Sequence, residues 1–197
     1  PTVTGTATLA AGDTLAVTIN GTTYTTANGL TVDPVAGTWS VTLPTTAEGT
    51  YAVTAVVTDA AGNTATDTSN NELIIDTTAP AIPTVVSQVT NDTTPTVTGT
   101  ATLAVGETLA VTINGTTYTT ANGLTVDPVA GTWSVTLPTT AEGTYAVTAV
   151  VTDAAGNTAT DITTNELVID TTAPATPTVV SQVTNDTTPT VTGTATL

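Results

Sequence analysis

Carboxylates and amide oxygens are the groups in this sequence that could do chemistry, because the chain contains no His, Cys, Lys or Arg. The most informative cluster is the motif TDAAGN at 152–157, in which Asp153 and Asn157 bracket a tight turn. Oxygen ligands from a loop suit a hard cation such as Ca²⁺, which accepts about six to eight of them in loose geometry. The motif therefore predicts a structural calcium site, whereas the missing bases and nucleophiles argue against an enzyme.

The charge balance of the chain favours the same prediction. Sixteen Asp and Glu residues face no Lys or Arg, so the formal net charge is −16. Carboxylates without cationic partners repel one another, and divalent counter-ions relieve that repulsion. The same balance argues against binding to nucleic acid, since no side chain could neutralise phosphates. No run approaches the roughly 18 apolar residues of a spanning helix, so this segment is not expected to insert into a membrane.

A sequence repeat organises the chain. The nonapeptide PTVTGTATL occurs at 1–9, 95–103 and 189–197, so the period is 94 residues, from position 1 to position 95. Superposing 1–103 on 95–197 leaves seven differences, most of them conservative: Ala11/Val105, Asp13/Glu107, Thr68/Ile162, Ser69/Thr163, Asn70/Thr164, Ile74/Val168 and Ile82/Thr176. Repetition of this kind adds length without adding new chemistry, which favours a spacer.

The clearest linker is the Pro-rich stretch DTTAP, which begins at Asp76 and again at Asp170. This frame predicts that 1–76 is a repeat lacking its first strand and that 77–170 is a complete repeat. Residues 171–197 are then the first strand, and the start of the second, of another repeat. Pro1 begins neither a signal peptide nor a tag, so the sequence is expected to be an excerpt from a longer chain.

The composition predicts strands. Thr and Val are abundant, and their branched Cβ suits a pleated, half-buried surface better than a helix. Turn signals recur about every eight to twelve residues, as in a β-sandwich. We therefore expect an all-β fold of about seven antiparallel strands with Greek-key connections. In the complete repeat the expected strands are 83–89, 96–102, 108–113, 116–126 with a bulge at Asn122-Gly123, one through Trp133 and Leu137, one through Tyr145 and Val151, and 158–169.

The strand order also predicts which turns share an end of the sandwich. The incoming linker with Asp76 should lie at the same end as the turn that carries Asp153 and Asn157. Two carboxylates and an amide oxygen then converge, and they are the expected calcium ligands. Glu107 and Asp127 lie in turns at this end and are weaker candidates for the same shell. The alternative is that Asp and Asn simply favour turns.

A second acidic group marks the opposite end: the turn at Asn91-Asp92, then Glu142, and Asp170 at the exit. These residues either complete the shell of the next junction, with Asp92 as a weaker ligand candidate, or only shape their turns. The acidic residues of the last predicted strand are expected to be solvated edge charges that prevent edge-to-edge pairing. They are Asp67, Glu72, Asp161 and Glu166.

The aromatic residues are expected to be structural. Trp133 alternates with Val135 and Leu137, which puts the three side chains on one face of a strand and favours a core over a sugar-binding platform. The segment AEGTYAV, at 47–53 and 141–147, resembles the tyrosine corner of immunoglobulin-like domains, in which the Tyr hydroxyl bonds the backbone of the preceding turn. The expected domain is therefore an Ig-like β-sandwich.

Four motifs in order, GTWSVTLP, EGTYAV, VTDAAGN and DTTAP, resemble the bacterial Ig-like (BIg) extender repeats of giant type I-secreted, RTX-type adhesins. The resemblance covers the whole chain. It implies domains arranged end to end, calcium at their junctions, and an extracellular place on a bacterial surface, as in adhesins that build biofilm. Carried over by position, it implies junction ligands at Asp76, Asp153 and Asn157. Asp59, Asn63 and Asp170 would serve neighbouring junctions. A type I secretion route is implied by the family alone, since this segment contains no RTX nonapeptide.

The leading hypothesis is an extender of a bacterial cell-surface adhesin, stiffened by Ca²⁺, whose partners are neighbouring repeats of the same chain. One alternative is that each repeat is itself an adhesive module, since near-identical copies give avidity. Another is self-assembly by strand donation, because the first repeat lacks a strand that residues 171–188 offer. A carboxylate-only enzyme such as a glycosidase is not expected, because the acids gather at repeat ends rather than in a pocket.

Overall fold

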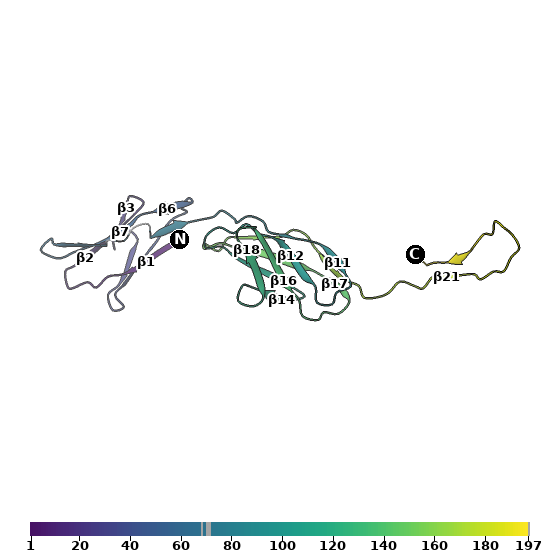
Figure 1. The fold of residues 1–197 in the computed structure, drawn as a ribbon. Coiled ribbons are helices and arrows are strands. Elements are labelled where there is room, and N and C mark those ends of the chain that lie inside the picture. The colour runs from purple at the N-terminus through teal and green to yellow at the C-terminus, as the bar shows by residue number, and fades with distance from the viewer. Residues whose placement is uncertain (68, 70–71, 197) are drawn as a thin grey trace. The chain divides into compact units, whose positions relative to one another are not determined.

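The computed structural model describes residues 1–67, 69 and 72–196 (Figure 1). Its secondary structure consists of β-strands joined by turns, with no helix in the part of the chain described, which confirms the predicted all-β fold. The chain divides into two compact units. One unit comprises residues 1–79 with 153–157, and the other comprises residues 80–152 with 158–197.

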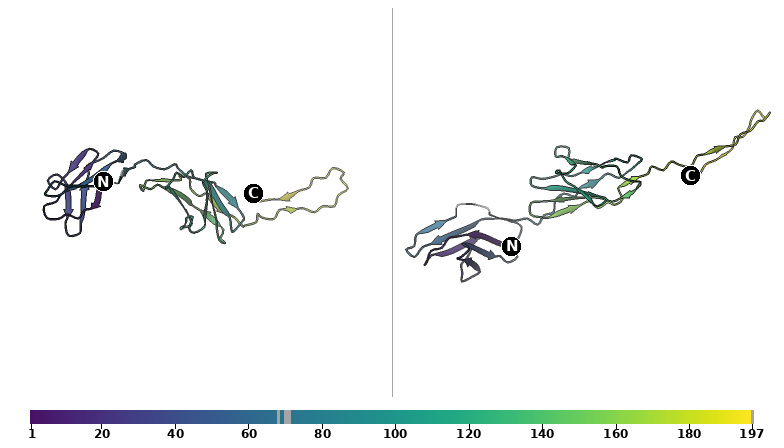
Figure 2. Two further views of the ribbon diagram at one scale, coloured as in Figure 1. Left: turned by 60° about the vertical axis from the view of Figure 1, so that its left-hand side comes forward. Right: turned by 90° about the horizontal axis from the view of Figure 1, so that it is seen from below.

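The complete repeat is built from two four-stranded sheets and one smaller sheet (Figure 2). The first sheet has the order β10 (Thr84–Val85), β12 (Thr96–Thr100), β16 (Thr132–Thr136), β15 (Leu124–Asp127). The second has the order β14 (Thr116–Tyr118), β13 (Thr108–Ile113), β18 (Val147–Thr152), β19 (Thr158–Thr160). The small sheet has the order β11 (Gln88–Thr90), β20 (Leu167–Ile169), β17 (Gly143–Tyr145).

The first repeat contains the same arrangement without counterparts of β10 and β11. Its sheets have the orders β1-β5-β4, β3-β2-β7-β8 and β6-β9. The strands are β1 (Thr2–Thr6), β2 (Thr14–Ile19), β3 (Thr22–Tyr24), β4 (Leu30–Asp33), β5 (Thr38–Thr42), β6 (Gly49–Tyr51), β7 (Val53–Thr58), β8 (Thr64–Thr66) and β9 (Leu73–Ile75). After the second repeat, β21 (Thr178–Val179) pairs with β22 (Gly193–Thr194).

The predicted repeat boundaries at 76/77 and 170/171 stay predictions.

The cores form where the alternation predicts them. Trp133, Val135 and Leu137 are all buried, as expected for one face of a strand. They pack in one cluster with buried side chains of β13 and β18 from the facing sheet. The first repeat has a corresponding cluster around Trp39. The hydrophobic pattern alone was therefore sufficient to place the interior of each sandwich.

The strands are more divided than the sequence predicts. The expected strand 116–126 is two strands, β14 and β15, which belong to different sheets. The Asn122-Gly123 pair between them forms a turn rather than a bulge: Asn122 Oδ1 accepts a hydrogen bond from Thr119 Oγ1 at 2.9 Å, and Gly123 has a φ of 107°. The expected strands 83–89 and 158–169 divide in the same way. A chain that changes sheet must leave one hydrogen-bonded ladder before it enters the next.

One strand pair departs from the expected antiparallel order. β11 lies parallel to β20, with Gln88 opposite Leu167 and Thr90 opposite Ile169. The cause is the division of the first strand. Its first half, β10, pairs antiparallel with β12, and the chain then crosses to the other sheet and runs beside the last strand. The other strand pairs of the described chain are antiparallel.

Candidate metal centre

The turn at 153–157 holds its own shape through hydrogen bonds to one aspartate. Asp153 Oδ1 accepts from the backbone N–H groups of Ala155 at 2.9 Å and Asn157 at 2.8 Å. Gly156 takes a φ of 92°, which closes the turn at a backbone conformation that favours glycine. The carboxylate is therefore fixed by the backbone, with its second oxygen directed to the side chain of Asn157.

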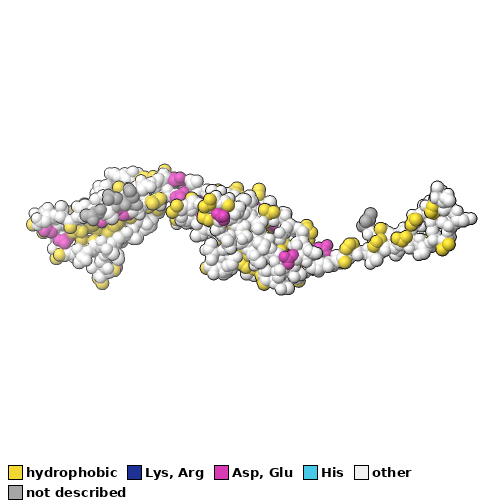
Figure 3. Space-filling view, viewed as in Figure 1, with side chains coloured by type: hydrophobic (Ala, Val, Ile, Leu, Met, Phe, Trp, Pro, Cys, Tyr) yellow, Lys and Arg dark blue, Asp and Glu magenta, His cyan; other side chains and the backbone are white. Residues whose placement is uncertain are grey.

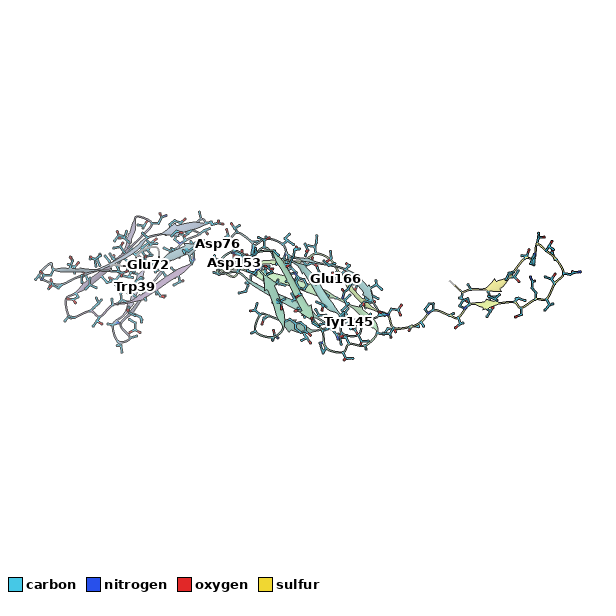
Figure 4. All side chains as sticks on the ribbon, viewed as in Figure 1. Trp39, Glu72, Asp76, Tyr145, Asp153 and Glu166 are labelled. Atoms are coloured by element: carbon cyan, nitrogen blue, oxygen red, sulfur yellow. The ribbon has the colours of Figure 1, made fainter. Side chains whose placement is uncertain are left out.

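The structure brings Asp76, Asp153 and Asn157 together through other groups than predicted: one carboxylate and a backbone carbonyl face the Asn157 amide nitrogen, where two carboxylates and an amide oxygen were expected. Figure 4 labels Asp76 and Asp153. Asn157 Nδ2 donates to Asp153 Oδ2 at 2.8 Å and to the backbone carbonyl of Asp76 at 3.0 Å. All three residues belong to the same compact unit. Asp76 takes part through its carbonyl oxygen, while its carboxylate Oδ1 accepts from Thr78 N at 3.0 Å.

The donor set fits calcium in kind but not in number. The carboxylate of Asp153 and the carbonyl of Asp76 are hard oxygens that meet at one point, and the Asn157 amide could supply a third by rotation. The partially positive hydrogens of the Asn157 Nδ2 group face these two oxygens. No group of three or more His, Cys, Asp or Glu side chains among the described residues is placed to hold a metal. Calcium here would therefore need water to complete its shell.

Electrostatics keep this carboxylate ionised. The hydrogen bond from the Asn157 side chain, supported by backbone N–H groups of the turn, holds the pKa of Asp153 below its ordinary value. The first repeat has the same turn, in which Asn63 Nδ2 donates to Asp59 Oδ2 at 2.8 Å. That bond likewise lowers the pKa of Asp59. The negative charge that a cation would meet is present at neutral pH in both copies.

The weaker candidates and Asp170 cap their own turns. Glu107 Oε2 accepts from Ala104 N at 2.8 Å. Asp127 Oδ1 accepts from the backbone N–H groups of Val129 and Ala130, each at 2.9 Å. Asp92 and Asp170 accept in the same way from the residues two positions later, Thr94 N at 2.8 Å and Thr172 N at 3.0 Å. Their contacts are those of turn-forming residues, and a ligand role for them stays a prediction.

The predicted grouping of turns at two ends agrees with bonds between turns. Ala101 N donates to Gly131 O at 2.9 Å, which joins the turn before Glu107 to the turn after Asp127. At the opposite end, Leu137 N donates to Pro95 O and Asp170 N donates to Thr90 O.

A clasp on the linker is the feature that sequence reasoning missed. Glu142 accepts from Thr171 N at 3.0 Å, from Thr171 Oγ1 at 2.7 Å and from Thr172 Oγ1 at 3.0 Å. Glu48 holds Thr77 and Thr78 in the same way in the first repeat. We call each set, Glu48 with Thr77 and Thr78 or Glu142 with Thr171 and Thr172, a linker clasp. The available signal was the fixed spacing of the glutamate from the TT pair in both copies.

The linker clasps are charge-assisted. The hydroxyl and backbone N–H of Thr171, with the hydroxyl of Thr172, hold the pKa of Glu142 below its ordinary value of 4.5. The pKa of Glu48 is lowered by the corresponding bonds from Thr77 and Thr78. The glutamates therefore bind the start of each DTTAP linker as carboxylates at neutral pH.

The tyrosine corner is present in both repeats. Tyr145 Oη donates to Ala141 O at 2.9 Å, and Tyr51 Oη donates to Ala47 O at 3.0 Å. The predicted structural role of this motif is confirmed.

The prediction that Glu166 is a solvated edge charge is wrong. Its side chain is 1% exposed, and its Oε2 accepts from Val147 N at 3.0 Å while Oε1 has no partner among the described residues. The physical reason is β11, which pairs with β20 and covers Glu166, the residue just before β20. Glu72, at the same position in the first repeat, is exposed.

Comparison with known proteins decides the family. A model of the bacterial Ig-like domain matches residues 1–77 and 84–171. The chain belongs to the bacterial Ig-like domain family. Among curated proteins, none matches this sequence. The described part of this bacterial Ig-like chain has no helix long and apolar enough to cross a membrane.

Solved structures similar to this bacterial Ig-like chain include part of a 1.5-MDa bacterial ice-binding adhesin studied for host cell surface retention. That match has 29% identity and a TM-score of 0.39 over 91% of this chain, which spans 60% of the adhesin chain. The fibronectin(III)-like modules of Clostridium thermocellum CbhA match at 11% identity and a TM-score of 0.46, with 85% of each chain covered. Titin domains I67-I69 match at 12% identity and a TM-score of 0.44, over 86% of this chain and 59% of theirs.

Proposed function

We propose that this chain is a structural extender from a bacterial cell-surface adhesin. The observation that carries the proposal is the repetition of one bacterial Ig-like domain with only seven differences between copies over the overlapping sequence. Binding and catalytic residues lie disproportionately on loops, whereas an array of repeats gains length with each added copy. The two identical linker clasps support the same function, because each repeat fixes the start of its outgoing linker by the same bonds.

The extender has no catalytic role in this proposal, and its partners are the neighbouring repeats of its own chain. Its place is outside the cell, on the bacterial surface. A family of bacterial Ig-like domains and a chain without cysteine fit that location, where calcium is available to an acidic protein.

Calcium is the second part of the proposal. We place it where the linker carbonyl of Asp76 meets the turn of Asp153 and Asn157, and it stiffens the array there. Support comes from the oxygens that converge on Asn157 Nδ2 and from a net charge of −16 without any Lys or Arg. The chain's own residues would contribute a fixed carboxylate and a carbonyl, and the ion would supply positive charge between them.

Thermal unfolding with Ca²⁺ and with EGTA tests the calcium site. We expect Ca²⁺ to raise the unfolding temperature and to change the small-angle scattering profile, with Mg²⁺ much less effective because it dehydrates reluctantly. Asp153→Asn should remove most of the calcium effect. Asp127→Asn is the matched control, because Asp127 caps a different turn. An unfolding temperature and a scattering profile that both ignore EGTA would eliminate calcium from the proposal.

Scattering from chains of two, four and six repeats tests the extender itself. We expect the maximum dimension to grow in proportion to the number of repeats. A dimension that levels off as repeats are added would contradict an extender, whether or not calcium binds.

A further inference from the structure

Each repeat contains two Asn-Gly pairs, and the fold holds the two pairs differently. They are Asn20-Gly21 and Asn28-Gly29 in the first repeat, and Asn114-Gly115 and Asn122-Gly123 in the second. All four asparagines are exposed. Asn is a thermolabile residue, and a following glycine has no Cβ to shield its backbone nitrogen from the Asn side chain. The four pairs therefore share one chemistry, and their surroundings decide which of them can react.

The side chain of Asn122 is fixed by three hydrogen bonds. Its Oδ1 accepts from Thr119 N and from Thr119 Oγ1, the latter at 2.9 Å, and its Nδ2 donates to Thr117 O at 2.9 Å. Asn28 makes the corresponding three bonds in the first repeat. Moving Cγ of either side chain toward the nitrogen of the next residue breaks these bonds, so the fold opposes a reaction of the amide there.

The side chain of Asn114 is free by comparison. No described residue forms a hydrogen bond with its amide group, and the same holds for Asn20. Asn114 and Gly115 form the tip of a hairpin whose ladder begins at the pair Ile113 and Thr116. A Cβ on Gly115 would meet no atom within 4 Å apart from its chain neighbours. The Asn114 amide can therefore rotate toward Gly115 without breaking a hydrogen bond.

The hairpin tip is also weakly held by its strands. β14 has three residues and lies at the end of its sheet, where it pairs with β13 alone. Asn114 and Gly115 have φ values of 50° and 77°, and closing a ring through the Gly115 nitrogen changes these turn torsions, so the tip must open first. Local opening of such an edge costs much less than global unfolding. Asn122 must open its turn and also lose its side-chain bonds.

We propose that Asn114 and Asn20 are sites of spontaneous deamidation, a covalent modification that water completes. The Gly115 nitrogen attacks Asn114 Cγ, and a C–N bond forms while the bond from Cγ to Nδ2 breaks. The proton of the Gly115 N–H leaves with Nδ2 as ammonia, and a cyclic imide remains. Water then adds to either imide carbonyl and breaks its bond to the ring nitrogen, which gives aspartate or isoaspartate. Asn20 reacts with Gly21 in the same way.

The modification changes both the hairpin and the charge of each repeat. Isoaspartate adds one carbon to the main chain inside a two-residue turn, so it should loosen the pairing of β13 with β14. Either product adds a carboxylate. The visible face in Figure 3 shows acidic and no basic side chains, and the sequence has no Lys or Arg, so the new charge is unrelieved. The inference goes beyond the extender role and does not depend on calcium.

Peptide mapping by mass spectrometry tests the sites on the full 197-residue chain, kept folded at mildly alkaline pH. We expect Asn114 and Asn20 to be converted at least about tenfold faster than Asn122 and Asn28, since each of the latter loses three hydrogen bonds on opening. In denaturant the four pairs should react at similar rates. Equal rates in the folded chain would overturn the proposal. A preference that persists in denaturant would overturn it too, because the fold would then not select the sites.

A matched variant tests the cause of the protection. Thr119→Val removes the hydroxyl that donates to Asn122 Oδ1 and keeps a branched side chain of similar size. We expect conversion of Asn122 to rise several-fold, with Asn114 unchanged and Asn28 in the unaltered first repeat as the internal control. An Asn122 rate that stays at the level of Asn28 would overturn hydrogen bonding as the reason for its protection.

Discussion

The surroundings of one glutamate differ between the two copies of the repeat. Glu166 is buried and Glu72 is exposed, although both accept a hydrogen bond from the backbone N–H of the valine nineteen residues earlier, Val147 and Val53. In the buried copy this bond stabilises a backbone N–H that has no access to water. The residue is thus part of the sandwich interior, where its Oε2 is the acceptor for Val147 N.

Removing the Glu166 side chain should destabilise the second repeat. Glu166→Ala leaves Val147 N without its acceptor, at a cost of about 1–3 kcal/mol. Glu166→Gln keeps an acceptor for Val147 N, so its cost should be smaller. Chemical denaturation followed by hydrogen exchange in β18 measures both. The control is Glu72→Ala, which should change the first repeat less, and an equal loss in the two repeats would contradict the role of burial.

The linker clasps should open in acid. Because the folded-state pKa of Glu142 lies below its ordinary value of 4.5, its stabilising effect is complete above that value and is lost as the pH falls through the lowered pKa. The amide resonance of Thr171 should follow this titration by NMR. Glu142→Gln should abolish the pH dependence at Thr171 and leave it at Thr77, which Glu48 holds. A Thr171 amide that titrates unchanged in the variant would disprove the clasp.

Local residue roles were predictable, and those that depend on a distant strand were not. The Asn114-Gly115 pair is a local hairpin signal because both residues tolerate positive φ, and they have φ values of 50° and 77°. The tyrosine corner also lies within five residues. Burial of Glu166 depends on β11, which is far away in the sequence. The bonds of Glu142 to Thr171 depend on where the chain runs after the last strand, β20. The sequence spacing between the two residues is constant, but it does not by itself predict a hydrogen bond.

At the scale of elements, short strands and sheet changes build the sandwich. The alternation of apolar residues predicted which face of each strand is buried. It did not predict where a strand stops, because Thr-rich segments such as 116–126 and 158–169 read as continuous strands. The breaks occur where the chain passes between sheets. That position is fixed by pairing with other strands and not by local propensity.

A glycine in the middle of a strand should be sensitive to the strand beside it. In Gly99→Ala the new Cβ would meet Thr84 O at 2.0 Å and the Trp133 ring at 2.5 Å. We expect a loss of about 1–3 kcal/mol in the second repeat, with hydrogen exchange showing β10 released at Val86 N. Gly5→Ala, the matched change in the first repeat, meets only the Trp39 ring at 2.5 Å and should cost less. Identical losses would mean that β10 contributes nothing.

At the scale of the whole molecule, electrostatic repulsion is unrelieved by any basic side chain. All sixteen charged side chains are carboxylates, and hydrogen bonds hold several of them ionised by lowering their pKa. Such repulsion destabilises a compact state at low ionic strength. Sequence composition predicted this property completely, whereas the ligand roles of Asp76, Asp153 and the other candidates stay predictions, since a turn-capping aspartate and a calcium ligand have the same sequence signal.

Monovalent salt should therefore stabilise the chain. Raising NaCl from roughly 0.01 M to roughly 0.5 M shortens the screening length and should raise the unfolding temperature by roughly 5 °C for each kcal/mol of repulsion relieved. At matched ionic strength, CaCl₂ should stabilise further if it occupies a defined site. An unfolding temperature that does not change with NaCl would show that the carboxylates are too dispersed to repel one another. Equal effects of NaCl and CaCl₂ would show that calcium acts only by general screening and not at a defined site.

The parallel pairing of β11 with β20 has a mechanical consequence. In a parallel pair the chain enters at one end of the ladder and leaves at the other. Tension applied to the two ends of the second repeat pulls these strands along their length in opposite directions, so the rungs are loaded together in shear. An antiparallel pair with both free ends on the same side would instead open one rung at a time, like a zipper. The crossing of the first strand between sheets is thus the feature that lets a short ladder resist a pull.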